Sequence, residues 1–215
     1  MTDRQYNPLD KINLGKSVAE ALLDRPLVSL GKLQPFEGAG VYVIYYMGKS
    51  PPYKEMGRRN TQSADWPIYI GKAVPSGSRR GSSLFSEIRG RVLFNRLQEH
   101  ADSIGATDLN IHDFKCRYLI VDDIWIPLGE SLLIARFKPV WNQILDGFGN
   151  HDPGVGRYNG MRPLWDVLHP GRAWADRCQK RTETKTQLAQ RVLEFLNANP
   201  PPEDPHISFD TPPTK

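Results

Sequence analysis

Cysteine and long apolar runs are both scarce in this sequence. Its 215 residues include two cysteines, Cys116 and Cys178, which lie far apart with no Cys-x-x-Cys pair. That spacing argues against a disulfide framework and a zinc site, and it fits reduced thiols. No stretch reaches the roughly 18 apolar residues that a membrane-spanning helix needs, and the first residues lack the apolar core of a signal peptide. We therefore expect a cytoplasmic protein without a membrane partner.

Signature motifs of several enzyme classes are missing as well. Gly-Lys occurs at 15–16, 31–32, 48–49 and 71–72, but no copy has the earlier glycine of a phosphate-binding P-loop. Neither His-Glu-x-x-His nor Gly-x-Ser-x-Gly occurs, which argues against the common zinc proteases and serine hydrolases. The triplet Asn150-His151-Asp152 resembles metal ligands, but a lone polar triplet in a loop is more typical of a turn. The sequence therefore predicts no nucleotide cofactor.

The modest net charge of +4 is unevenly distributed. Residues 72–96 carry six basic side chains against one acidic one, and residues 154–191 carry eight against three. Because each neutralised phosphate releases counterions, two basic segments in an otherwise acidic chain favour a polyanion-binding surface. A solvated charged face remains an equal alternative on charge alone. Arginine is the main basic residue in both segments, and its planar guanidinium suits contacts with phosphate and guanine. The candidate DNA-binding residues are therefore Arg79, Arg80, Arg89, Arg162, Arg172 and Arg177.

Hydrophobic periodicity predicts an α+β core. Concentrations of β-branched and aromatic residues predict strands at 40–46, 68–71 and 116–121. Apolar spacing predicts helices at 84–101 and 128–137, the second started by Pro127 and stopped by Pro139. The polar segment 48–66 reads as a long surface loop. The order strand, strand, helix, strand, helix is typical of a small sheet packed against helices.

The remaining chain divides into extensions around that core, which spans 38–144. The N-terminal extension, 1–37, carries a short helix around 17–23. The C-terminal extension, 145–198, begins with a loop rich in glycine and proline and ends with an amphipathic helix at 185–197. Its loops are expected to contribute to DNA binding. The tail 199–215 is rich in proline and is expected to be extended or disordered.

Polar residues at the predicted strands and helices form the candidate site. Tyr42 and Tyr69 fall on neighbouring strands, in Gly40-Val41-Tyr42 and Tyr69-Ile70-Gly71. Arg96 and His100 are four residues apart and share one helix face. Glu130 lies near the start of the last core helix, and Asn142 follows Lys138-Pro139. Taken singly, each has an ordinary reading: a core tyrosine, a solvated helix face, a charge at a helix start and a helix cap.

In order and spacing, these residues resemble the GIY-YIG nuclease superfamily. Its hallmark is a paired Gly-Ile-Tyr and Tyr-Ile-Gly, a helix with Arg-x-x-x-His, a helix-borne Glu, and an Asn after Lys-Pro; here Val41 replaces the usual Ile. The resemblance covers about 38–144 and implies a three-stranded antiparallel sheet flanked by helices. Within the superfamily, the chain looks like the small branch of type II restriction endonucleases that act as compact homodimers on a GC-rich palindrome, and it is similar to those that cut CCGCGG. This implies double-stranded DNA as substrate, a homodimer and a GC-rich palindromic site.

Phosphodiester hydrolysis suggests roles for two of these residues. Glu130 is the only carboxylate of the set, so it is the expected ligand of one Mg²⁺ ion, for which Mn²⁺ is the expected substitute. Asp122-Asp123 are the other nearby candidates and are interpreted as structural or supporting. Arg96 is expected to pair with the scissile phosphate and to stabilise the charge of the transition state.

The resemblance supplies the remaining roles. It implies that Tyr42 is the general base for water, which requires a nearby cation or proton acceptor because a free tyrosine has a pKa near 10. His100 is the expected acceptor or relay, and Lys72 is expected to favour the phenolate. Tyr69 is expected to orient water or phosphate, and Asn142 to anchor the site by hydrogen bonds.

Two alternatives stay open. One is a GIY-YIG nuclease that recognises DNA structure or repairs lesions, although no zinc-ligand cluster or helix-hairpin-helix pattern is present. The other is a catalytically silent DNA-binding module of the same fold. Against it, every polar position of the candidate site holds a reactive residue type.

Overall fold

The apolar run at 40–46 forms the second strand of one antiparallel sheet in the computed structural model, which describes residues 7, 9–75 and 90–203. This strand, β2 (Gly40–Tyr46), pairs with β3 (Pro67–Ala73) on one side and with β4 (Phe114–Ile120) on the other. A further strand, β1 (Val28–Ser29), pairs with β4, so that the order is β1-β4-β2-β3. The predicted α+β class is confirmed. The two-residue β1 was not predicted, because it is too short to carry a hydrophobic pattern.

Both faces of β2 are buried, and this divides the protein into two apolar cores. All seven residues of the strand are buried. Tyr42, Ile44 and Tyr46 belong to one core, whereas the alternate residues Val41, Val43 and Tyr45 belong to the other. A strand that is buried on both faces reads as a continuous apolar run, which is why the sequence shows no alternation here.

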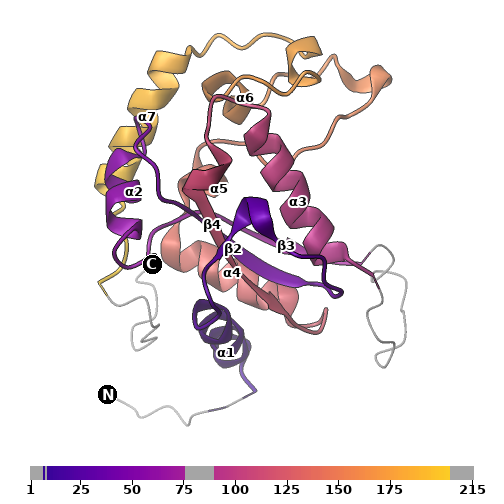
Figure 1. The fold of residues 1–215 in the computed structure, drawn as a ribbon, viewed down its shortest axis with the longest axis vertical. Helices are drawn as coiled ribbons and strands as arrows, with labels where there is room; N and C mark the ends of the chain where they lie inside the picture. Colours follow the sequence, from indigo (N-terminus) through magenta and orange to yellow (C-terminus); the bar gives the residue numbers. More distant parts are fainter. Residues whose placement is uncertain (1–6, 8, 76–89, 204–215) are drawn as a thin grey trace.

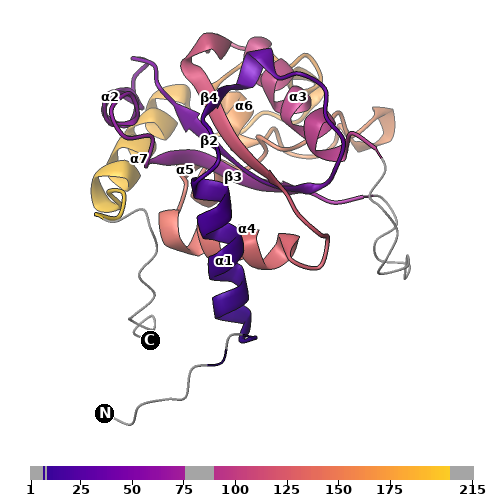
Figure 2. The same ribbon diagram turned by 60° about the horizontal axis from the view of Figure 1, so that its bottom comes forward.

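Helices cover both faces of the sheet (Figures 1 and 2). The face that carries Tyr42 packs against α3 (Val92–Gly105), α5 (Val140–Gln143), α6 (Leu164–Leu168) and α7 (Lys185–Ala198). The opposite face packs against α1 (Lys11–Leu23) and α4 (Ile126–Phe137). The predicted C-terminal amphipathic helix is confirmed as α7, whose Leu188 and Val192 reach the same core as Tyr42. The C-terminal extension thus helps to build the core behind the candidate site.

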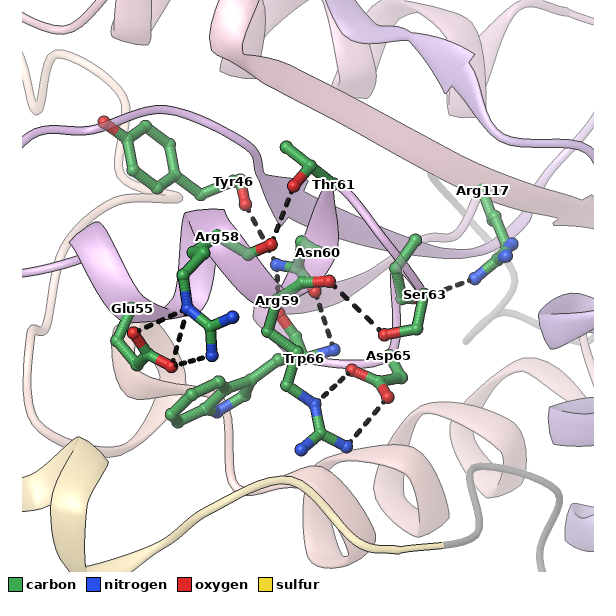
Figure 3. A network of polar contacts seen from close by, with 11 residues as sticks. Tyr46, Glu55, Arg58, Arg59, Asn60, Thr61, Ser63, Asp65, Trp66 and Arg117 are labelled. Carbon is green, nitrogen blue, oxygen red and sulfur yellow. Dashed lines mark hydrogen bonds and ion pairs between the residues drawn. The ribbon is translucent and has the colours of Figure 1, made fainter.

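The prediction that 48–66 is a long surface loop is wrong. The segment contains α2 (Lys54–Asn60) and buries Tyr53 and Met56. The Asn60 amide donates to the backbone oxygens of Tyr46 and Trp66 and accepts from the Trp66 N–H (Figure 3). A buried amide with three backbone partners compensates for its own desolvation. One polar residue thereby ties the end of β2 to the start of β3, which hydropathy did not indicate.

Several boundaries differ from the prediction. Helix α1 begins at Lys11 rather than around Ser17. Helix α3 begins at Val92; the first part of the predicted helix, 84–89, lies outside the described residues, as does most of the tail. Lys138 adopts a left-handed conformation with φ 43° and ends α4, so that Asn142 lies in the separate helix α5. Short 3-10 turns occur at Leu30–Lys32, Ile111–Asp113, Val155–Arg157 and Ala175–Arg177.

None of the helices within the described part of the chain is both long enough and apolar enough to cross a membrane.

Candidate active site

Two glycines allow the tyrosine strands to approach. Tyr42 pairs with Gly71 across β2 and β3. A Cβ atom at Gly71 would lie 2.6 Å from Cζ of Tyr42, so the phenol ring lies across the bare backbone of Gly71. A Cβ at Gly40 would lie 2.9 Å from the backbone carbon of Leu119 on β4. The paired Gly-x-Tyr and Tyr-x-Gly therefore has a steric cause: each glycine permits a close approach that a side chain would block.

Gly71→Ala is expected to displace the Tyr42 ring and to destabilise the fold by about 1–3 kcal/mol, the usual cost of overpacking a core. Because the phenol is at the centre of the candidate site, any activity should fall with it. Urea unfolding measures the first effect. Gly105→Ala is the control, since no atom lies within 4 Å of its Cβ position, and it should be neutral or slightly stabilising. Equal stability of the two variants would contradict the steric explanation.

Tyr42 and His100 form a buried hydrogen-bonded pair. The distance between Tyr42 Oη and His100 Nε2 is 2.6 Å, and both side chains are almost fully buried. Burial raises the pKa of Tyr42 well above its usual value, an effect that the Arg96 charge partly opposes. Burial also lowers the pKa of His100 well below its usual value. Both groups are therefore neutral at neutral pH, and Tyr42 can donate to Nε2 when the His100 proton lies on Nδ1.

Aromatic rings enclose the His100 imidazole. The Phe148 ring stacks on it with a centroid distance of 4.4 Å and an interplanar angle of 14°. Tyr69 meets it edge-on at 5.2 Å and lies 6.2 Å from the Tyr42 ring. The prediction that Tyr42 and Tyr69 lie on neighbouring strands is confirmed. Because these rings exclude water, they account for the low pKa of His100.

Glu130 and Lys72 form an ion pair beside the tyrosines. Lys72 Nζ lies 2.6 Å from Glu130 Oε2, with 40% and 16% of the respective side chains exposed. The negative charge of Glu130 contributes to the raised pKa values of Tyr42 and Tyr69, which places the carboxylate close to both phenols. Lys72 therefore has the Glu130 carboxylate as an ion-pair partner, and the expectation that it favours the Tyr42 phenolate stays a prediction. Helix α4 begins at Ile126, so Glu130 also lies beyond the first turn, where the sequence had suggested a helix-dipole role.

The Glu130 carboxylate has the chemistry of a ligand for a divalent ion. It is a partly buried anion that already holds a cation, and carboxylate oxygens are the ligands that Mg²⁺ prefers. The described residues contain no group of three or more histidines, cysteines or acids that could hold a metal. Any metal here would therefore depend on Glu130, with phosphate oxygens and water as its other ligands.

Arg96 lies at the mouth of a cavity of about 210 Å³ between α3 and the loop after α5. Its guanidinium donates to the Gly149 carbonyl at 2.8 Å and contacts His151 Nε2 at 2.7 Å and Glu99 Oε2 at 3.2 Å. The guanidinium is thus fixed in orientation and remains partly exposed, with 22% of the side chain accessible. Such a fixed planar donor suits a phosphate.

Asn142 anchors a strand of the site. Its Oδ1 accepts from the Ile70 N–H at 2.9 Å, and its Nδ2 donates to the Ile70 carbonyl at 2.8 Å. Because β3 is an edge strand, the Asn142 amide takes the place that a neighbouring strand would occupy. It fixes the backbone between Tyr69 and Gly71 and so positions both neighbours of the Tyr42 phenol.

The arginines that were predicted to bind DNA lie in different environments or outside the described residues. Arg79, Arg80 and Arg89 lie outside the described residues. Arg172 is buried, with all its bonds inside the protein, so the expectation that it contacts DNA is corrected by the structure. Arg162 donates to the Ala175 carbonyl and pairs with Asp176, and Arg177 donates to the Tyr158 hydroxyl. No feature of the sequence indicated that Arg172 is buried, because it is one of many basic residues in that segment.

The sequence interpretation also missed the loop after α5. Phe148, Gly149 and His151 contact His100 or Arg96, although more than 40 residues separate them along the chain. Asp152 behaves as the predicted turn residue and accepts from the Gly154 N–H and the Tyr158 hydroxyl. The triplet at 150–152 was therefore interpreted correctly at Asp152, whereas His151 contacts the candidate site. In the sequence, only the residue type of His151 pointed to a role in the site.

Two buried histidines predict that the fold is sensitive to acid. Burial lowers the pKa of His169 to about 3 and that of His100 well below its usual value. Unfolding exposes both, so between about pH 6.5 and their folded pKa values the unfolded state binds more protons. The free energy of unfolding should therefore fall as the pH drops below about 6.5, by up to roughly 1.4 kcal/mol per pH unit for each histidine. Urea unfolding across this pH range measures the slope.

Single variants assign the slope to these groups. His169→Asn should reduce the pH dependence by about one proton, because the group no longer titrates on unfolding. His112 is exposed, and His112→Ala should leave the slope unchanged. Identical slopes in the wild type and the His169 variant would show that the buried imidazole is not the cause.

Comparison with protein families gives one match to this arrangement. The model described as the Eco29kI GIY-YIG domain matches residues 34–196, which include β2, β3, β4 and all seven candidate catalytic residues. The match also includes the loop after α5 and most of α7. A comparison with curated proteins finds no match.

Proposed function

Because this chain belongs to the family of Eco29kI-type GIY-YIG restriction endonuclease domains, we propose that it is a type II restriction endonuclease. The substrate is double-stranded DNA, cut at a GC-rich palindrome for which CCGCGG is the candidate. The observation that carries the proposal is the hydrogen bond between Tyr42 and His100, with Arg96 and the Glu130 carboxylate beside it. A palindromic site implies a homodimer, because each half-site then meets the same surface.

The site residues divide the work of hydrolysis. A water molecule attacks phosphorus, the bond to the 3′ oxygen breaks, and the products carry a 5′-phosphate and a 3′-hydroxyl. Arg96 binds the scissile phosphate and stabilises the charge that develops on its oxygens. Glu130 would hold Mg²⁺, or Mn²⁺ in its place, and the bound ion would supply Lewis-acid neutralisation of that charge. Lys72 balances the Glu130 carboxylate when the ion is absent.

Proton removal from water runs through the Tyr42–His100 pair. The raised pKa of Tyr42 makes a resting phenolate unfavourable, so the hydroxyl must lose its proton as it accepts one. The neutral His100 imidazole is the acceptor at 2.6 Å. Tyr69 orients the water or phosphate, and Asn142 holds the strand that carries Tyr69. The tyrosine thus serves as a relay that passes the proton from water to His100.

Incubation of plasmid DNA with the protein and Mg²⁺, analysed on a gel, tests the proposal. Discrete fragments that disappear on chelation support a metal-dependent restriction enzyme. A smear would indicate a non-specific nuclease, and cleavage confined to branched or damaged DNA would indicate a structure-specific or repair nuclease. Gel-shift binding without cleavage would indicate a silent DNA-binding module. Run-off sequencing of discrete products would then test CCGCGG, and sedimentation would test the homodimer.

A further inference from the structure

Arg172 is the most completely bonded side chain near the candidate site. It is 5% exposed and makes two hydrogen bonds to the buried Asp166 carboxylate, from Nε at 2.7 Å and from Nη2. Its other three N–H groups donate to the backbone carbonyls of Gly147, Phe148 and Asn150, at 2.8, 3.1 and 3.0 Å. A guanidinium has five N–H donors, and all five are used.

Two tryptophans hold the guanidinium in its plane. Its central carbon lies 4.7 Å from the Trp165 ring centroid and 4.8 Å from that of Trp174. Cation–π contacts with two rings add to the five hydrogen bonds of a desolvated cation. The group is therefore fixed in both orientation and position, and it has no donor left for a DNA phosphate.

The three carbonyls belong to residues 147–151, here called the 147–151 loop. This loop contacts α3, the helix that carries Arg96 and His100. From this loop Phe148 stacks on His100, while the Gly149 carbonyl and the His151 imidazole contact Arg96. A Cβ atom at Gly149 would lie 2.7 Å from Nη2 of Arg96, so the backbone itself meets the guanidinium. Arg172 thus bonds the backbone of a loop that also contacts Arg96 and His100 on α3.

We propose that Arg172 is a positioning residue for DNA cleavage: by fastening the 147–151 loop against α3, it sets the orientation of the Arg96 guanidinium and the His100 imidazole. The proposal rests on the proposed function, because it assigns Arg172 a part in that same reaction. A misplacement of about 1 Å at reacting groups can lower a rate about a hundredfold. An arginine in the C-terminal extension therefore acts on chemistry that takes place on α3.

The test variant is Arg172→Lys. Lysine keeps the positive charge beside Asp166, which avoids an uncompensated buried carboxylate, but its single ammonium cannot reach three carbonyls and two carboxylate oxygens at once. Single-turnover cleavage should fall by about tenfold to a hundredfold, with the Kd for uncut DNA unchanged. The dependence of Kd on salt should also keep its slope, because no phosphate contact is lost. Weaker binding with a shallower salt slope would overturn the proposal and make Arg172 a phosphate ligand.

Arg117→Lys is the matched control. Arg117 donates to the backbone carbonyls of Arg25 and Ala64, bonds the Tyr45 hydroxyl and packs on the Tyr45 ring, which belongs to the core on the opposite face of the sheet from Tyr42. Both substitutions remove hydrogen bonds from a guanidinium to backbone carbonyls and a cation–π contact. Only Arg172→Lys should slow cleavage by folded protein, with folding checked by thermal unfolding. Equal losses in both variants would overturn the proposal, because they would show a general effect of stability.

A readout without DNA separates this inference from the proposed function. NMR titration of the His100 ring reports its pKa, which burial by neighbours such as Phe148 lowers in the wild type. Because lysine keeps the charge of Arg172, a rise of that pKa in Arg172→Lys would reflect a loosened loop and increased hydration. We expect such a rise; an unchanged titration would overturn the proposal. The experiment stands even if the wild-type protein cuts no DNA, a result that would overturn the proposed function instead.

Discussion

Glu130→Ala is expected to lower the rate of DNA cleavage by about a thousandfold or more, since Lewis-acid stabilisation is worth several kcal/mol and each 1.4 kcal/mol is a factor of ten. Within the described residues, Glu130 is the carboxylate whose charge contributes to the pKa values of both Tyr42 and Tyr69, and no group of three or more histidines, cysteines or acids is there to hold the metal in its place. Stability should change little, because the Lys72 side chain of the ion pair is 40% exposed, and a pair with an exposed partner contributes at most about 1 kcal/mol. Cleavage of a plasmid under single-turnover conditions measures the rate.

Two further variants make this result specific. Glu130→Gln keeps the shape of the side chain and removes its charge, and it should be nearly as inactive as alanine. Glu194 is an exposed glutamate on α7, and Glu194→Ala should cleave at the wild-type rate. DNA binding without metal should persist in all three proteins. Discrete cleavage by Glu130→Ala within tenfold of the wild-type rate would remove Glu130 from the mechanism.

Sequence patterns predicted those site residues whose positions are set by the strand or helix that carries them. The run at 40–46 is apolar because both faces of β2 are buried, and this marks the strand that carries Tyr42. Arg96 and His100 share a face of α3 because a helix brings residues four apart together. Tyr42 and Tyr69 lie side by side because consecutive strands of a small sheet commonly pair. In each case the spacing of the residues along the chain determines which of them are neighbours in the structure.

Contacts between segments that are far apart in the sequence have no comparable pattern, and they were not predicted. Arg172 reads as basic surface in the sequence, but in the structure it is buried against Trp165 and Trp174 and bonds within the protein. Lys72 was expected to favour the Tyr42 phenolate as a neighbouring cation, and its ion pair with Glu130 on α4 was not predicted. Asn60 is similarly a polar residue in a polar segment that becomes a buried bridge between strands. Partners of polar groups are set by packing, which hydropathy does not report.

Tyr42→Phe is expected to reduce cleavage by about a hundredfold to ten-thousandfold, the usual contribution of general acid–base catalysis. The substitution keeps the ring that lies across Gly71 and removes the hydroxyl that joins water to His100. The His100 nitrogen then loses its partner in a buried place, which should lower the free energy of unfolding by about 1–3 kcal/mol. Single-turnover cleavage and urea unfolding measure the two effects separately.

The chain contains its own control for this variant, since a second buried tyrosine–histidine pair lies on the same side of the sheet. Tyr53 Oη is 2.8 Å from His169 Nε2 and also accepts from the Trp141 indole at 3.0 Å. Tyr53→Phe therefore removes two buried hydrogen bonds and should cost at least as much stability as Tyr42→Phe, but it should leave cleavage by folded protein unchanged. Because each variant removes the hydroxyl of a buried tyrosine–histidine pair, the difference in the cleavage rates of the folded proteins measures chemistry at His100. Equal rates would assign Tyr42 a structural role and leave the proton path to another group.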